Sequence, residues 1–182
     1  MLKGHTIYIR PLETEDAEEN LRLQSENRAF FEQFSMIRAD DYYTVEGQRK
    51  RIEQYQQRLD NDQEYHFGIF TNKDHTLIGT VSLFQIIRGA LQCAFIGYFL
   101  DKAHNGKGLM AEAVRLIVDY AFYDLKLHRI EAGVMPRNLG SMRVLEKAGF
   151  HKEGIARKNV KINGKKWEDH QVLAILNPDD EK

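Results

Sequence analysis

Residues 97–111 decide the fold, and they read Gly97-Tyr98-Phe99-Leu100-Asp101-Lys102-Ala103-His104-Asn105-Gly106-Lys107-Gly108-Leu109-Met110-Ala111. An apolar segment ends at Leu100, a polar turn with two glycines follows, and an amphipathic helix begins after Gly108. The first N–H groups of a helix lack intrahelical acceptors, so a glycine-containing loop leading into a helix forms an anion cradle. The stretch therefore predicts a binding site for a phosphate-bearing small molecule.

The rest of the chain predicts one α+β domain over residues 1–182, because no linker, repeat or low-complexity segment divides it. We expect a mixed, mostly antiparallel central sheet with helices on both faces. Segment 28–43 is expected to be irregular. The expected elements are strand 6–10, helices 14–27 and 44–59, strands 65–70, 76–87 and 91–100, helix 109–121, strand 129–135, helix 138–148, and a closing hairpin of strands 151–159 and 167–176.

The strand at 91–100, the helix after Gly108 and the strand at 129–135 form a βαβ unit. Such units join parallel strands by a right-handed crossover. Ligands of these sheets bind at the carboxyl ends of parallel strands, and the glycine loop follows directly on one such end.

Composition limits the classes of function. The chain has 182 residues and a net charge of −1, which predicts no nucleic-acid partner. No run approaches the roughly 18 apolar residues of a membrane span, and residues 1–10 lack a secretion signal, so we expect no membrane partner and a cytoplasmic location. The single cysteine, Cys93, forms no intrachain disulfide, and the scattered histidines indicate no metal site. A homodimer is the default oligomer.

The glycine loop has competing interpretations. Gly106, Gly108 and Ala111 also satisfy the G-x-G-x-x-A pattern of dinucleotide-binding proteins. That pattern should be followed by an acidic residue near the end of the next strand, whereas Glu131 falls inside it and only one βαβ unit is present. A plain structural turn is the third interpretation.

Two blocks of sequence resemble the GCN5-related N-acetyltransferase (GNAT) superfamily. The first is Gly106-Lys107-Gly108 followed by Glu112-Ala113, and the second runs from Asn138-Leu139-Gly140-Ser141 to Gly149-Phe150. Together with Arg10-Pro11-Leu12, Leu77-Ile78-Gly79 and Ile96-Gly97-Tyr98, they are most similar to the ribosomal-protein alanine N-acetyltransferases of the RimJ/RimL type. The resemblance implies an acetyl-CoA-dependent acyltransferase that needs no metal and acts on an amine, such as a protein N-terminus.

The same resemblance implies roles for individual residues. A backbone N–H near Phe99 would stabilise the oxyanion, and Ser141 would pass a proton to the departing thiolate. Asn138 would hydrogen-bond the pantetheine arm, and it also suits the start of the following helix, a role compatible with the first. Phe30, Phe31 and Phe34 would border the acceptor, unless they are simply core. The residues expected to contact acetyl-CoA are Phe99, Leu100, His104, Asn105, Gly106, Lys107, Gly108, Leu109, Met110, Asn138 and Ser141.

Two residues depart from the family pattern. Phe95 stands where many relatives carry a glutamate base, and Leu145 stands where many carry a tyrosine acid. The base is therefore unassigned, with Glu64 and His66 as weak candidates. A protein α-amine has a pKa near 7.7–8.0 and needs less help from a base than a lysine, with a pKa near 10.4. Rival functions are acetylation of a small amine such as a polyamine or aminoglycoside, non-catalytic acetyl-CoA binding, and dinucleotide-dependent oxidoreduction.

Overall fold

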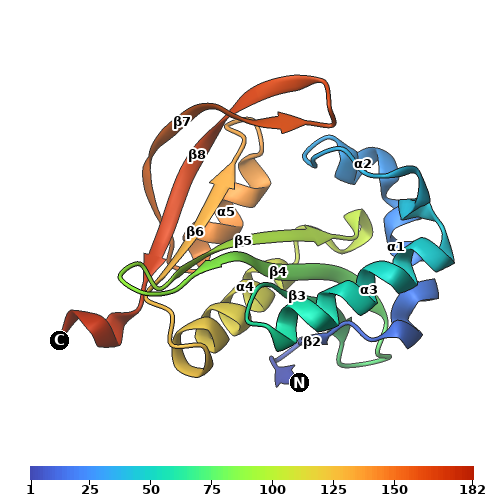
Figure 1. Cartoon of the computed structure of the whole chain (residues 1–182), viewed down its shortest axis with the longest axis horizontal. Coiled ribbons are helices and arrows are strands. Elements are labelled where there is room, and N and C mark those ends of the chain that lie inside the picture. The colour runs from blue at the N-terminus through green and yellow to red at the C-terminus, as the bar shows by residue number, and fades with distance from the viewer.

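The computed structural model describes residues 1–182, and its centre is an eight-stranded sheet in the order β1-β2-β3-β4-β5-β6-β8-β7 (Figure 1). All neighbouring strands are antiparallel except β5 and β6. The predicted α+β class is confirmed. The strands are β1 (Leu2–Lys3), β2 (Ile7–Pro11), β3 (Tyr65–Thr71), β4 (Leu77–Ile87), β5 (Cys93–Leu100), β6 (Arg129–Val134), β7 (His151–Ile162) and β8 (Lys166–Leu176).

Helices cover both faces of this sheet. Side chains alternate along β2, so that Ile7 and Ile9 join the core beneath α4, while Tyr8 joins a smaller core beneath α1 and α3. No helix is long and apolar enough to cross a membrane. The helices are α1 (Ala17–Glu26), α2 (Arg28–Glu32), α3 (Val45–Asp60), α4 (Leu109–Asp119) and α5 (Leu139–Lys147), and a π-helical turn (Tyr120–Asp124) extends α4.

The parallel pair splits soon after it forms. The ladder between β5 and β6 joins Cys93–Phe95 to Arg129–Glu131, whereas β5 continues to Leu100 and β6 to Val134. Beyond Phe95 the two strands diverge (Figure 1). The parallel βαβ unit expected from the sequence is thus confirmed.

The segment that follows α2 contacts the β7–β8 hairpin across the gap between β5 and β6. The β7–β8 turn carries Asn163 and Gly164 at φ +47° and +65°, the left-handed geometry of a tight hairpin turn. The Asn163 N–H donates to the Ser35 carbonyl at 2.8 Å. The Arg137 Nη2 donates to the Gln33 carbonyl at 3.3 Å. The tip of the hairpin therefore lies against the segment that follows α2 (Figure 1).

The structure differs from the expected elements at a few places. Segment 28–43, expected to be irregular, contains α2 and a 3-10 turn at Asp40–Tyr43. The strand expected over 151–159 continues to Ile162, because the hairpin pairs almost to its turn. Strand β1 was not predicted, since two residues are too few to show a period.

Candidate active site

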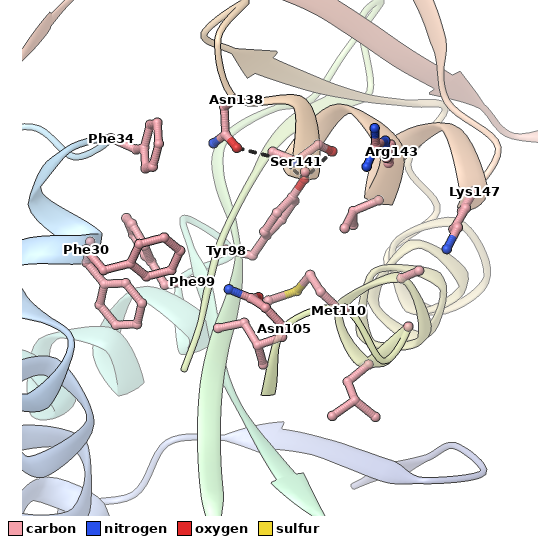
Figure 2. Close-up of a pocket in the computed structure, with 18 residues that line it drawn as sticks. Phe30, Phe34, Tyr98, Phe99, Asn105, Met110, Asn138, Ser141, Arg143 and Lys147 are labelled. Carbon is pink, nitrogen blue, oxygen red and sulfur yellow. Dashed lines mark hydrogen bonds between the residues drawn. The ribbon is translucent and has the colours of Figure 1, made fainter. Parts of the chain in front are cut away.

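A cavity of about 590 Å³ occupies the open end of the split, between β5, α2 and the first turns of α4 and α5 (Figure 2). It brings together most of the residues singled out from the sequence, and the first and last of these are more than a hundred positions apart along the chain. Neither His104 nor Lys107 lines it. The lining residues are Phe30, Phe31, Phe34, Tyr98, Phe99, Leu100, Asn105, Gly106, Gly108, Leu109, Met110, Ala111, Asn138, Gly140, Ser141, Arg143, Val144 and Lys147.

The start of α4 forms a row of unsatisfied donors. The backbone N–H groups of residues 106–111 donate to no carbonyl or side chain, and the first bonded amide of the helix is that of Glu112. Gly106 and Gly108 have φ of +79° and +76°, a conformation that L residues rarely adopt. A Cβ at either position would meet nothing within 4 Å, so the space above the loop is open. This geometry fits a diphosphate, because both the amides and the helix dipole favour negative charge.

Positive side chains flank this cradle. Arg143 and Lys147 are the charged residues of the cavity lining, and neither forms an ion pair. Both lie on the side of α5 that faces the start of α4 (Figure 2). Arg143 and Lys147 were not predicted from the sequence, although their spacing from Gly140 is that of one helix face. Two unpaired cations beside free amides strengthen the fit to a polyphosphate ligand.

The edge of β5 exposes backbone groups toward the cavity. The Asp101 N–H donates to the Ile78 carbonyl on β4 at 2.8 Å. Because hydrogen-bonding direction alternates along an antiparallel ladder, the Phe99 amide also faces β4, whereas those of Tyr98 and Leu100 face the open edge. The Phe99 amide itself is therefore turned away from the cavity, and the nearest amides at the open edge are those of Tyr98 and Leu100. An extended ligand segment beside β5 would meet the amides of Tyr98 and Leu100.

Ser141 is held by a tyrosine that the sequence analysis did not single out for this role. The Tyr98 hydroxyl is 2.7 Å from Ser141 Oγ and also donates to the Ser141 carbonyl at 3.2 Å. Both residues line the cavity, and the two side chains meet at its centre (Figure 2). Burial raises the pKa of Tyr98 above its ordinary value, so the phenol stays neutral. The pair can therefore relay a proton without carrying a charge.

Asn138 begins α5 and lines the cavity as well. Its Oδ1 accepts from the Ser141 N–H at 3.3 Å, which makes it the N-cap of this helix. Its Nδ2 has no partner among the protein's hydrogen bonds. One side chain thus caps the helix with its oxygen and leaves an amide donor available to a ligand.

The three phenylalanines form the opposite wall of the cavity, from α2 to β5 (Figure 2). Phe31 is 1% exposed and packs on Phe99 with ring centres 5.0 Å apart, so it belongs to the core and to the cavity at once. Phe30 and Phe34 are half-buried, with ring centres 6.4 Å apart. The core interpretation is thus confirmed for Phe31, and a role of the three rings in binding the acceptor stays a prediction.

The positions that depart from the family pattern lie outside the cavity. Leu145 is fully buried in the larger core, and Phe95 packs against Phe84 with ring centres 5.9 Å apart. Glu64 and His66 hydrogen-bond each other at 2.7 Å, and this bond is the main cause that lowers the pKa of Glu64. Neither candidate base lines the cavity. No group of three or more His, Cys, Asp or Glu side chains is placed to hold a metal.

Comparisons with known proteins agree with this geometry. The family described as acetyltransferase (GNAT) domain matches residues 6–151. The probable N-acetyltransferase YjcK of Bacillus subtilis (strain 168) is 86% identical over 182 residues, which cover 100% of both chains.

Two solved structures share the whole fold. The ribosomal-protein-S5-alanine acetyltransferase of Vibrio fischeri is 33% identical with a TM-score of 0.91, over 97% of this chain and 96% of that one. Mycobacterium smegmatis RimJ, in complex with CoA-disulfide, is 25% identical with a TM-score of 0.90, over 97% and 84% of the two chains. The resemblance seen in the sequence is confirmed, and this chain belongs to the GNAT family of N-acetyltransferases.

Proposed function

We propose that this enzyme transfers the acetyl group of acetyl-CoA to the N-terminal α-amine of a protein. The observation that carries the proposal is the row of unpaired amides at residues 106–111, which lies along the same cavity as Ser141. The names of the two structural relatives support an α-amine acceptor, since one is a ribosomal-protein-S5-alanine acetyltransferase and the other is a RimJ.

Acetyl-CoA would supply an acetyl group that is activated as a thioester. The amides of residues 106–111, with Arg143 and Lys147, would bind its phosphates. The open edge of β5 would hold the pantetheine arm as an added strand, with Asn138 Nδ2 donating from the other side. The amides of Tyr98 and Leu100 are placed to stabilise negative charge on the carbonyl oxygen. Ser141, hydrogen-bonded to Tyr98, would give its proton to the leaving sulfur and take one back from water, which receives the proton that the attacking amine loses.

Charge in the cavity favours an α-amine over a polyamine. The charged residues of the lining are Arg143 and Lys147, and no carboxylate lines it. A polycationic acceptor would need carboxylates to offset its charge, whereas a protein N-terminus reacts as a neutral amine. Because about a tenth or more of α-amines are neutral near pH 7, loss of the proton needs no strong base.

Peptide acetylation tests this proposal directly. We expect release of free CoA thiol with peptides that begin with alanine or serine, and mass spectrometry should place the acetyl group on the α-amine. The comparison set is the same peptides with a blocked N-terminus and an internal lysine, together with spermidine. Faster turnover on spermidine or on the internal lysine would contradict an α-amine acceptor.

The double role of Asn138 gives a separate prediction. Asn138→Ser keeps an oxygen that can cap α5, so the free energy of unfolding should change by only a few tenths of a kcal/mol. The same change removes the Nδ2 donor, so the Kd for acetyl-CoA should rise roughly fivefold, as one lost neutral hydrogen bond of about 1 kcal/mol implies. Calorimetry and chemical denaturation measure the two effects. An unchanged Kd would reduce Asn138 to a helix cap.

A further inference from the structure

Two arginine side chains lie against one tyrosine ring at the Phe99 wall of the cavity. The guanidinium carbon of Arg38 is 4.4 Å from the centre of the Tyr42 ring and 5.4 Å from that of Phe99. The guanidinium carbon of Arg51 is 4.8 Å from the same Tyr42 ring. Because Phe99 lines the cavity, Arg38 of this arginine pair lies next to a wall of the site, and Arg51 is joined to it through the Tyr42 ring.

The arginine pair lies on the side of the sheet away from the phosphate cradle. Successive side chains of a strand point to opposite faces, so Phe99 and Tyr98 diverge. Tyr98 reaches Ser141 on the face of α4 and α5, whereas Phe99 packs on Phe31 in the smaller core beneath α1 and α3. An acceptor that approaches from the side opposite acetyl-CoA therefore passes the arginine pair.

Nearby carboxylates offset these two charges only in part, because the one ion pair is a long contact between Arg51 and Asp41 at 3.8 Å. Arg38 forms no ion pair and donates to the Tyr43 hydroxyl at 3.0 Å. That hydroxyl donates in turn to Glu32, whose carboxylate is shared with Arg28 at 3.2 Å. Arg38 thus reaches the carboxylate only through the phenol. The tyrosine contact fixes the guanidinium but leaves most of its five donors without an acceptor.

Arg51 is also short of acceptors. Its nearest carboxylate oxygen, on Asp41, is 3.8 Å away, and its buried Nε has no hydrogen-bond partner. Stacking of guanidinium groups on Tyr42 is a common packing arrangement and accounts for where the side chains lie. It does not account for a buried donor with no acceptor, which is a costly arrangement. A carboxylate that reached the free donors of either guanidinium group would accept hydrogen bonds from it and offset part of this positive charge.

We propose that Arg38 and Arg51 form a carboxylate-binding subsite for the acceptor, so that the enzyme prefers protein N-termini with Asp or Glu at the second or third residue. This inference rests on the proposed function. An extended peptide advances roughly 3.3–3.6 Å per residue, so a chain whose amine lies beside Phe99 brings one of these side chains to the arginine pair. The guanidinium fork matches a carboxylate with two parallel hydrogen bonds.

Matched peptides test the subsite in the unaltered enzyme. The pairs differ only in Asp against Asn at the second residue, or Glu against Gln at the third. We expect kcat/KM to be about 10- to 100-fold higher for the acidic member, the range of one charge-assisted hydrogen bond. Raising salt from roughly 0.1 M to 1 M should shrink this preference, because the screening length falls from about 10 Å to 3 Å.

Variants assign the preference to the two arginines. Arg38→Gln and Arg51→Gln should each lower the acidic preference at least threefold through the KM for peptide, with the KM for acetyl-CoA unchanged, and Arg38→Lys should restore part of it. The control is Arg49→Gln, because Arg49 is exposed on the same helix as Arg51 and pairs with Glu46 at 3.1 Å.

The outcomes separate this inference from the proposed function. Equal rates on acidic and neutral peptides, or a preference that survives in both glutamine variants, would overturn the subsite and leave the α-amine acceptor standing. Failure to acetylate any peptide, with turnover on small amines, would overturn the proposed function itself. Loss of the acidic preference in Arg49→Gln would also overturn the subsite.

Discussion

Gly108→Val should greatly weaken the binding of acetyl-CoA while the protein still folds. Gly108 has φ +76°, so a β-branched residue there costs roughly 1–2 kcal/mol or drives the loop out of its conformation. The added side chain also projects into the open space beside the row of free amides. We expect the Kd for acetyl-CoA, measured by calorimetry, to rise about 100-fold, equivalent to ~2.8 kcal/mol, as lost charge-assisted hydrogen bonds imply.

Gly89→Val is the matched control for this experiment. Gly89 lies in the turn between β4 and β5, has φ +71°, and likewise meets nothing within 4 Å of its added Cβ. Both variants therefore suffer similar backbone strain, and thermal unfolding should show similar losses of stability. Gly108→Val should lose affinity and Gly89→Val should keep it. Equal affinity in the two variants would show that the start of α4 does not bind the diphosphate.

Ser141→Ala should lower kcat by about 100-fold, the lower end of what a positioned proton donor contributes. The KM for acetyl-CoA should change little, because the affected interaction develops as the thiolate leaves. Tyr98→Phe should lower kcat by roughly tenfold through the lost hydrogen bond to Ser141 Oγ. Steady-state kinetics with a saturating peptide measures both effects, and Ser25→Ala, at an exposed position on α1, serves as the control.

A double-mutant cycle shows whether the two hydroxyls act together. If Tyr98 works through Ser141, the double variant should be no slower than Ser141→Ala alone. Fully additive losses would mean that Tyr98 contributes to packing or acts on its own. An unchanged kcat in Ser141→Ala would remove this serine from the mechanism and leave water as the donor.

The sequence predicted the parts of the site that depend on local chemistry. Gly106 and Gly108 ahead of an amphipathic helix indicated the anion cradle, because both the donors and the backbone freedom are properties of neighbouring residues. Asn138 indicated a helix start for the same reason. The order of strands and helices then placed these two helix starts at the carboxyl ends of the parallel pair.

The parts that the sequence did not predict depend on contacts between distant segments. The hydrogen bond from Tyr98 to Ser141 joins residues 43 positions apart, and no local pattern records it. The divergence of β5 from β6 leaves one edge of β5 open, and its hydrogen-bond register with β4 turns the Leu100 amide, rather than the Phe99 amide, toward that edge. Arg38 lies in a segment expected to be irregular, whereas Arg51 lies in the helix that follows it, and the path of the chain between them brings both to the Tyr42 ring.

The contacts of segment 33–37 with Asn163 and Arg137 have a mechanical consequence. They connect the two parts of the sheet that separate at β5 and β6 at a second point, in addition to the β5–β6 ladder. Spreading these two parts would break the hydrogen bonds to Ser35 and Gln33, at roughly 1 kcal/mol each. These bonds therefore oppose any widening of the gap before a reactant arrives. Little of the binding energy is then lost to ordering, and more remains to align the reacting groups.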